Sequence, residues 1–269
     1  MAQDEERWAV PDLDQAIAVC RQRNREGIRC TLHPLLPYAA TPAQASSAPE
    51  PIISCLGAIA DARVDASLSI KLATLGSGVD RTLCRKGAEH VAGEAAARGI
   101  RLEIDMEGRG LAGFTLGTAA AIAKAGHRPT LAIQAYLDRS SADLRLILAS
   151  GIRPRIVKGA YLGDTGDFPA IQERFRALVL HAAESVAQFS AGTHDPDLIR
   201  WLEERFKGSR GQIEFGFLRG LADATKMRLA AGGWEVSEYV PFGRNPKAYV
   251  LRRERYLENL LANNRVPAP

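Results

Sequence analysis

Two adjacent arginines near the C-terminus, Arg252 and Arg253, are the residues whose type and spacing most clearly suggest chemistry. A guanidinium group matches the two oxygens of a carboxylate, so such a pair is typical of a site for a small carboxylic acid. Tyr249 precedes them by three and four residues, which places all three side chains on one surface of a helix. The run 252–255 taken alone is more typical of a solvated charged surface, so its interpretation depends on the rest of the chain.

The elements that would position these side chains alternate between strand-like and helical segments. The predicted strands are 28–32, 66–72, 101–106, 130–136, 155–160, 188–192, 213–217 and 236–240. A helix is predicted after each of them, which indicates parallel pairing through right-handed crossovers. Eight such units in about 240 residues predict an α/β fold, a (β/α)8 barrel of the TIM type. The alternative is a doubly wound open sheet, but no G-x-G-x-x-G motif follows the first strand.

We expect a single domain with a short N-terminal helix. In this division, an N-terminal helical extension covers residues 1–27 and the barrel covers residues 28–262. The segment 39–51 is rich in alanine, proline and serine, and is predicted to be a loop that leads into a helix.

Composition narrows the function classes. The chain has 269 residues, of which 46% are hydrophobic, and a net charge of +4. Basic residues are scattered among acidic ones, so no nucleic-acid partner is predicted. The four cysteines form no C-x-x-C pair, which is typical of reduced thiols. Neither a signal-peptide core nor an 18-residue apolar run is present, so we expect a cytoplasmic protein with at most peripheral membrane contact.

In a barrel, the active site lies at the carboxyl ends of the strands. Polar residues fall there repeatedly: Lys71, Asp105, Glu107, Gln134, Tyr136, Arg155, Lys158, Thr193, His194 and Glu214. His194 is taken as the only histidine at a strand end. The spacing of Asp105 and Glu107 places both on one side of a strand, where they could act as acid and base, although pairing with Lys71 or an arginine is favoured.

Several chemistries lack their motifs. No H-E-x-x-H, no histidine pair at ligand spacing and no G-x-S-x-G is present, so neither a metal site nor a serine nucleophile is predicted. The predicted rim is rich in cations and poor in nucleophiles. It suits an anionic cofactor and an anionic substrate better than it suits hydrolysis.

Residues 155–161, RIVKGAY, resemble the fifth-strand motif of proline dehydrogenases, including the domain found in bifunctional proline-catabolic flavoenzymes. Further matching segments follow in the family's order: 69–75, 104–107, 134–136, 193–194, 214–220, 239–243 and Tyr249-x-x-Arg252-Arg253. The resemblance extends from about residue 12 to about residue 260. It implies a (β/α)8 barrel with noncovalently bound FAD. The implied reaction oxidises L-proline to Δ1-pyrroline-5-carboxylate by hydride transfer from C5 to flavin N5, with a membrane quinone as electron acceptor.

The resemblance also implies residue roles. The catalytic residues would be Lys71, Asp105, Arg155 and Tyr249. The cofactor-binding residues would be Gln134, Arg155, Val157, Gly159, Ala160, Thr193 and His194. The substrate-binding residues would be Arg252 and Arg253 for the carboxylate, with Tyr161, Leu218 and Tyr239 around the ring.

Three positions depart from the family's pattern. The first strand usually ends in Leu-Gly-Glu, whose glutamate pairs with the second arginine, whereas this chain has Leu35-Leu36-Pro37. Gly216 stands where a flavin-contacting glutamine is common, and Tyr256 where a glutamate is usual. Two alternatives therefore stay open: a flavin enzyme that oxidises another cyclic or N-substituted amino acid in a biosynthetic pathway, and a metabolite-binding barrel without catalysis.

Overall fold

The computed structural model describes residues 6–159 and 163–265 and shows a closed barrel of eight parallel strands. The strands are β1 (Arg29–Pro34), β2 (Ala66–Ile70), β3 (Leu102–Ile104), β4 (Thr130–Gln134), β5 (Arg153–Val157), β6 (Phe189–Gly192), β7 (Ile213–Leu218) and β8 (Glu235–Phe242). Each strand pairs with its neighbours in the sequence, and β8 closes onto β1 through six residue pairs from Arg29–Ser237 to Pro34–Phe242. The predicted (β/α)8 barrel is thus confirmed.

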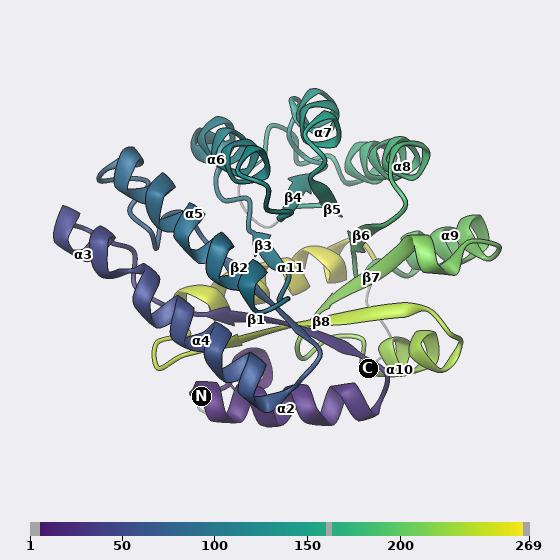
Figure 1. Ribbon diagram of the computed structural model, residues 1–269. Coiled ribbons are helices and arrows are strands. Elements are labelled where there is room, and N and C mark those ends of the chain that lie inside the picture. Colours follow the sequence, from purple (N-terminus) through teal and green to yellow (C-terminus); the bar gives the residue numbers. More distant parts are fainter. Residues whose placement is uncertain (1–5, 160–162, 266–269) are drawn as a thin grey trace.

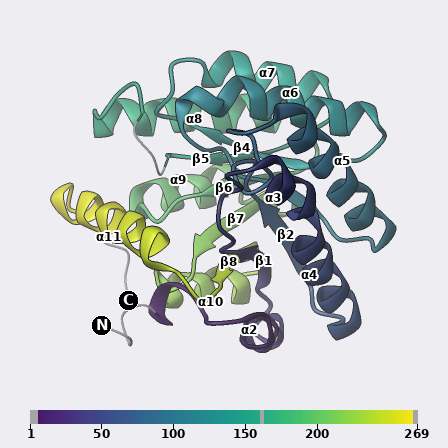
Figure 2. The same ribbon diagram turned by 90° about the vertical axis from the view of Figure 1, so that its left-hand side faces the viewer.

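Helices surround this barrel (Figure 1). They are α2 (Leu13–Arg25), α3 (Pro42–Ser47), α4 (Pro49–Ala62), α5 (Arg81–Ala97), α6 (Ala112–Lys124), α7 (Ser140–Ala149), α8 (Phe168–Ser185), α9 (Pro196–Phe206), α10 (Asp223–Ala231) and α11 (Lys247–Ala262). Aspartates begin several of them: the side chains of Asp12, Asp80 and Asp195 accept hydrogen bonds from backbone N–H groups in the first turns of α2, α5 and α9. In Figure 2, α11 lies away from the ring formed by the other helices.

The two faces of the barrel wall differ in chemistry. Alternate strand residues point outward, where aliphatic side chains form a core with the helices: Leu32, Leu68, Ile70, Ile104, Leu131, Ile133, Ile156, Val236 and Val240. Side chains inside the barrel are joined by hydrogen bonds instead, around the buried carboxylates of Glu103 and Glu214. Bulky branched residues usually fill the interior of such barrels. Here the interior is polar instead, so buried charged groups lie directly beneath the site.

Most strand boundaries differ from the predictions by one to three residues, and β2, β3, β4 and β5 end earlier than predicted. Strand β5 begins at Arg153 rather than at residue 155. A proline within a strand usually argues against that assignment, but Pro154 pairs in register with Leu131 of β4. Helix α3 lies inside the segment predicted as a loop, with Thr41 as its N-cap. Strand β1 continues to Pro34, two residues further than predicted, and so includes His33. The proposed division at residue 27 stays a prediction.

The segment before α2 supports the last helix. Trp8 is buried and packs in one cluster with Leu221 and with Tyr249 and Val250 of α11. Val10 forms a bridge with Phe242 at the end of β8. This packing fixes the first turns of the helix that carries the two arginines.

Candidate active site

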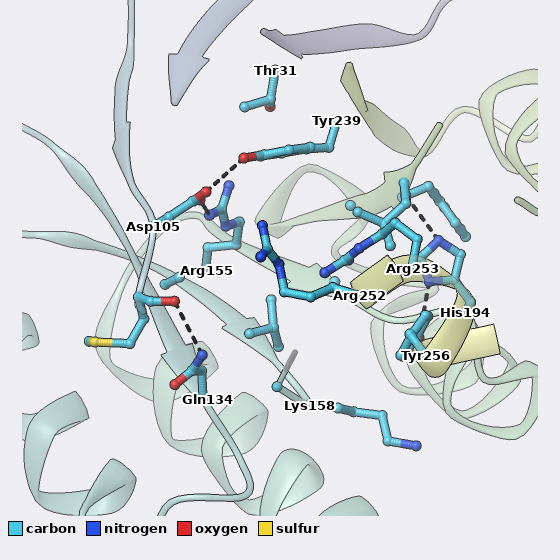
Figure 3. Close-up of a pocket in the computed structure, with 18 of the residues that line it drawn as sticks. Thr31, Asp105, Gln134, Arg155, Lys158, His194, Tyr239, Arg252, Arg253 and Tyr256 are labelled. Atoms are coloured by element: carbon cyan, nitrogen blue, oxygen red, sulfur yellow. Dashed lines mark hydrogen bonds and ion pairs between the residues drawn. The ribbon is translucent and has the colours of Figure 1, made fainter. Parts of the chain in front are cut away.

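A cavity opens at the carboxyl ends of the strands and is covered on one side by α11 (Figure 3). Its empty volume, part of which is open to solvent, is about 1010 Å³. Basic side chains dominate the charged residues that line it: Lys71, Arg155, Lys158, Arg252 and Arg253. In the described part of the chain, Asp105 is the one carboxylate on the wall. The cavity is therefore suited to anionic ligands.

Helix α11 brings the predicted carboxylate clamp into this cavity. Tyr249, Arg252 and Arg253 all line it, as their helical spacing predicts. Arg253 is 8% exposed, and its guanidinium carbon lies 5.0 Å from the centre of the Tyr249 ring. The Nε of Arg253 and the hydroxyl of Tyr249 are buried without a hydrogen-bond partner among the described residues. A bound carboxylate could satisfy both, because buried polar groups without partners are costly.

The opposite wall holds an ion-pair network centred on Asp105. Its carboxylate accepts from Arg155, from Lys71 at 3.2 Å and from the hydroxyl of Tyr239 at 2.7 Å. Burial alone would raise the pKa of Asp105, but Lys71 and Arg155 hold that pKa well below its usual range. Asp105 thus stays ionised and serves as the charge partner that the sequence favoured. Tyr239 keeps its proton, since burial raises its pKa well above the usual value.

His33 belongs to this network, although the sequence analysis missed it. Its Nδ1 donates to the Ser69 carbonyl at 3.0 Å, so Nε2 is free to accept from the Lys71 ammonium at 2.5 Å. Burial, followed by the charge of Lys71, lowers the pKa of His33 to about 3, so the ring stays neutral. Burial also lowers the pKa of Lys71. His194 is therefore not the only histidine at a strand end. The clue was available, since His33 directly follows the predicted strand 28–32.

His194 and Tyr256 join the end of β6 to α11. His194 Nε2 accepts from the backbone N–H of Leu218 at 2.9 Å, which leaves Nδ1 to donate to the Tyr256 hydroxyl at 3.1 Å. Burial is the largest cause that lowers the pKa of His194 to about 3, so this neutral form persists. Both ring nitrogens thus have partners within the chain. The predicted cofactor contact of His194 stays a prediction.

The floor of the cavity fits a flat, polar ring system such as a flavin. Gly192 and Gly216 pair across β6 and β7, and both line the cavity without a side chain. Gln134 is buried and donates to the Met106 carbonyl at 3.2 Å, while its own side-chain oxygen has no partner in the described chain. An orphaned amide oxygen beside a glycine floor fits a ring that carries N–H groups. Val157 also lines this floor.

Gly159 is a conformational requirement of the loop after β5. Its φ of +129° favours glycine, and an added Cβ would overlap the Tyr136 ring. Gly159 lines the cavity as predicted. Ala160 and Tyr161, predicted to contact cofactor and substrate, lie outside the described residues.

Other residues from the predicted rim point elsewhere. Thr193 is buried, and its hydroxyl accepts from the backbone N–H of Asp195 at 3.1 Å. Glu107 accepts from the backbone N–H of Ala73, and like Asp105 it lies beyond the end of β3. Glu214 was placed wrongly at a strand end. It lies near the start of β7, where it binds Arg101.

Lys158 directly follows β5 and lines the cavity. Its side chain points away from Arg252 and Arg253 (Figure 3). Its ammonium lies 3.4 Å from the centre of the Phe168 ring and 3.5 Å from Asp195. Burial outweighs Asp195 and lowers the pKa of Lys158 to about 8.

Residues 6–159 and 163–265 offer neither a metal site nor a membrane span. No group of three or more histidine, cysteine, aspartate or glutamate side chains is placed to hold a metal ion. None of the helices described combines the length and hydropathy needed to cross a bilayer.

Comparison with known proteins supports the resemblance. Proline dehydrogenase 1 of Bacillus subtilis subsp. natto is 27% identical over 248 residues, which cover 90% of this chain and 82% of that protein. The proline dehydrogenase of Deinococcus radiodurans is 29% identical over 261 residues, which cover 91% of this chain and 83% of that protein. No family model matches the chain. The predicted relationship to proline dehydrogenases is confirmed by these similarities.

Solved structures show the same fold. Proline utilization A (PutA) from Bdellovibrio bacteriovorus, inactivated by N-propargylglycine, matches 94% of this chain with a TM-score of 0.85 and 16% identity. PutA with proline bound in remote sites matches 94% with a TM-score of 0.79 and 22% identity. The chain spans about a third of the length of these proteins, 32% and 31% respectively.

Proposed function

We propose that this chain is an FAD-dependent oxidoreductase that oxidises L-proline to Δ1-pyrroline-5-carboxylate and passes the electrons to a quinone. Similarity to proline dehydrogenases over 90% of the chain supports the reaction class. The observation that best supports the site is that the residues predicted to bind substrate and those predicted to bind cofactor line one cavity. Arg252 and Arg253 enter it from α11, opposite Gln134 and Arg155 of β4 and β5.

The residues divide into a cofactor wall and a substrate wall. Gln134, Arg155, Val157 and Gly159 would hold the flavin ring, with Thr193 and His194 toward the rest of the cofactor. When bound, FAD supplies the acceptor for the hydride that leaves C5 of proline. This fit rests on the glycine floor and on the Gln134 side-chain oxygen, which has no partner among the described residues.

The substrate wall orients an anionic amino acid. Arg252 and Arg253 would bind its carboxylate through charge-assisted hydrogen bonds. Leu218, Tyr239 and Tyr249 would pack on the apolar ring and exclude water from it. Lys71 holds Asp105 ionised and in place, so that the Tyr239 hydroxyl keeps one orientation. Orienting C5 in this way is the main contribution of the protein to such a step.

A second substrate class is favoured by two positions that depart from the family's pattern, Tyr256 and Pro37. Tyr256, which lies where the family usually has a glutamate, is bound to His194, and the end of β1 offers no acid at Pro37. Proline and tyrosine thus stand at two positions where the family usually has glutamates. A flavin enzyme for another cyclic or N-substituted amino acid would also fit this arrangement.

The cofactor and the acceptor can be tested together. We expect the purified protein to carry FAD, seen in its absorption spectrum and released on denaturation, and to reduce a soluble quinone when L-proline is added. A well-folded protein that cannot be loaded with FAD would refute the proposal and favour a binding barrel. Reduction by another imino acid but not by proline would shift the proposal to the second substrate class.

A further inference from the structure

Glu103 is a buried carboxylate inside the barrel for which neither the sequence analysis nor the proposed reaction gives a role. It lies in the middle of β3, pairs in register with Ser69 of β2 and Thr130 of β4, and is 2% exposed. A carboxylate so buried needs several partners, because its desolvation costs several kcal/mol without them.

Both oxygens of Glu103 are held. One accepts from the hydroxyls of Ser67 at 2.6 Å and Thr31 at 3.1 Å, with Arg101 at 3.5 Å. The other accepts from a terminal nitrogen of Arg155. The hydroxyls come from β1 and β2 and the arginine from β5, so three strands fix the direction in which the carboxylate points.

Arg155 is thereby bound by two carboxylates at once. One terminal nitrogen donates to Glu103 and the other to Asp105. Burial alone would lower the pKa of Arg155, but the charges of Glu103 and Asp105 raise it. Asp105 also pairs with Lys71, so its charge is shared between two cations. Glu103 likewise meets a second cation, Arg101, so the two carboxylates together offset the charge of Arg155, and Glu103 is one of the two.

We propose that Glu103 is a positioning residue that fixes Arg155 and lowers the reduction potential of the bound flavin. The inference rests on the proposed function. A cation beside the flavin favours the reduced, anionic ring, and a carboxylate fixed on that cation opposes the effect. The opposition is substantial because the barrel interior screens charges poorly.

Glu214 provides a matched control within the same barrel. It is also a buried glutamate with 2% exposure, and it is bound by Ser190 and Ser237 as Glu103 is by Ser67 and Thr31. Its cations are Arg101, Arg153 and Arg29 near the start of the strands. No hydrogen bond or ion pair joins it to Arg155 in the part of the chain that the structure describes.

The experiment measures the flavin reduction potential of the FAD-loaded wild type, Glu103→Gln, Glu103→Asp and Glu214→Gln, each equilibrated anaerobically with a reference dye. We expect Glu103→Gln to retain FAD and to raise the ratio of reduced to oxidised flavin roughly tenfold at a fixed potential. Glu103→Asp keeps the negative charge but shortens the side chain by one methylene, so the carboxylate lies further from Arg155. It should raise the ratio of reduced to oxidised flavin less than Glu103→Gln does. Glu214→Gln should change it least.

Equal potentials in Glu103→Gln and Glu214→Gln, with FAD retained in both, would overturn the inference and leave the proposed function intact. If Glu103→Gln does not fold, an unchanged potential in Glu103→Asp would overturn it equally. A wild type that cannot be loaded with FAD would remove the proposed function, and the inference would fall with it.

Discussion

At the scale of single residues, Arg252 and Arg253 form the proposed carboxylate clamp, and a proline, Pro37, stands where the family usually has an acid. Arg253 is buried and lies on the Tyr249 ring, and its Nε has no hydrogen-bond partner among the described residues. The clamp residues were predictable because Tyr249, Arg252 and Arg253 follow a helical spacing that the sequence displays directly.

Arg252→Met should raise the KM for L-proline steeply while FAD content stays near that of the wild type. Loss of a charge-assisted contact to a carboxylate should cost roughly 2–4 kcal/mol, or about 30-fold to 1000-fold in KM. Arg255→Met, on the exposed side of the same helix, is the matched control and should leave KM within about twofold. Steady-state kinetics of both variants check this, and equal effects in the two would move the substrate away from α11.

Gly159→Ala should destabilise the protein and weaken FAD binding. The new Cβ would overlap the Tyr136 ring, and φ of +129° is unfavourable for alanine. Together these effects should cost roughly 2–5 kcal/mol of the free energy of unfolding. Gly166→Ala is the control, since a Cβ there meets nothing within 4 Å. Urea unfolding of the two variants measures the difference, and equal stability would show that Tyr136 moves aside at no cost.

At the scale of elements, the position of α11 depends on contacts at both of its ends. Trp8 packs against Tyr249 and Val250 at the start of the helix. Toward the other end, Tyr256 is bound to His194, and Arg265 just beyond the helix pairs with Asp197 of α9. The clamp is therefore held by segments from both termini and from β6.

Tyr256→Phe should raise the KM for proline while changing kcat little. The variant keeps the ring but removes the hydroxyl that accepts from His194, so α11 is held less firmly over the cavity. A hydrogen bond of this kind contributes about 0.5–1.5 kcal/mol, which corresponds to roughly a two- to tenfold rise in KM. A fall in kcat with KM unchanged would instead give the tyrosine a role in the chemical step.

At the scale of the whole molecule, the stability of the barrel should depend on two buried, neutral histidines. His33 and His194 have folded pKa values lowered to about 3 from the usual 6.5. The unfolded chain binds protons on them below pH 6.5 while the folded chain does not. Their contribution to stability is therefore fully present above pH 6.5 and is lost as the pH falls toward 3.

The free energy of unfolding should fall between pH 7 and pH 5, by about 2 kcal/mol for each of these histidines. In His33→Gln the fall should be smaller by about that amount, because glutamine does not titrate. His90→Gln, on the exposed surface of α5, is the control. Urea unfolding at the two pH values tests this, and an unchanged fall in His33→Gln would contradict the neutral, Lys71-bound ring.

The fold was largely predictable because alternation of strands and helices is a local pattern, and its eight units close into one architecture. The predicted strand boundaries were wrong where pairing with a neighbouring strand overrides local preference, as it does for Pro154 of β5, which pairs with Leu131. The site residues on α11 were predictable from spacing. His33 could have been found, because it directly follows the predicted strand 28–32. Its contact with Lys71 and that of Glu103 with Arg155 could not, because the partners are distant in sequence.

The central claim is that the cavity between the barrel rim and α11 oxidises proline with a bound flavin. Anaerobic titration of the FAD-loaded protein with L-proline tests it most directly, with pipecolate and hydroxyproline titrated in parallel. We predict that L-proline bleaches the oxidised flavin spectrum at lower concentration than either analogue. In Arg252→Met, bleaching should require a far higher concentration of L-proline. A flavin that stays oxidised with all three imino acids would contradict the account.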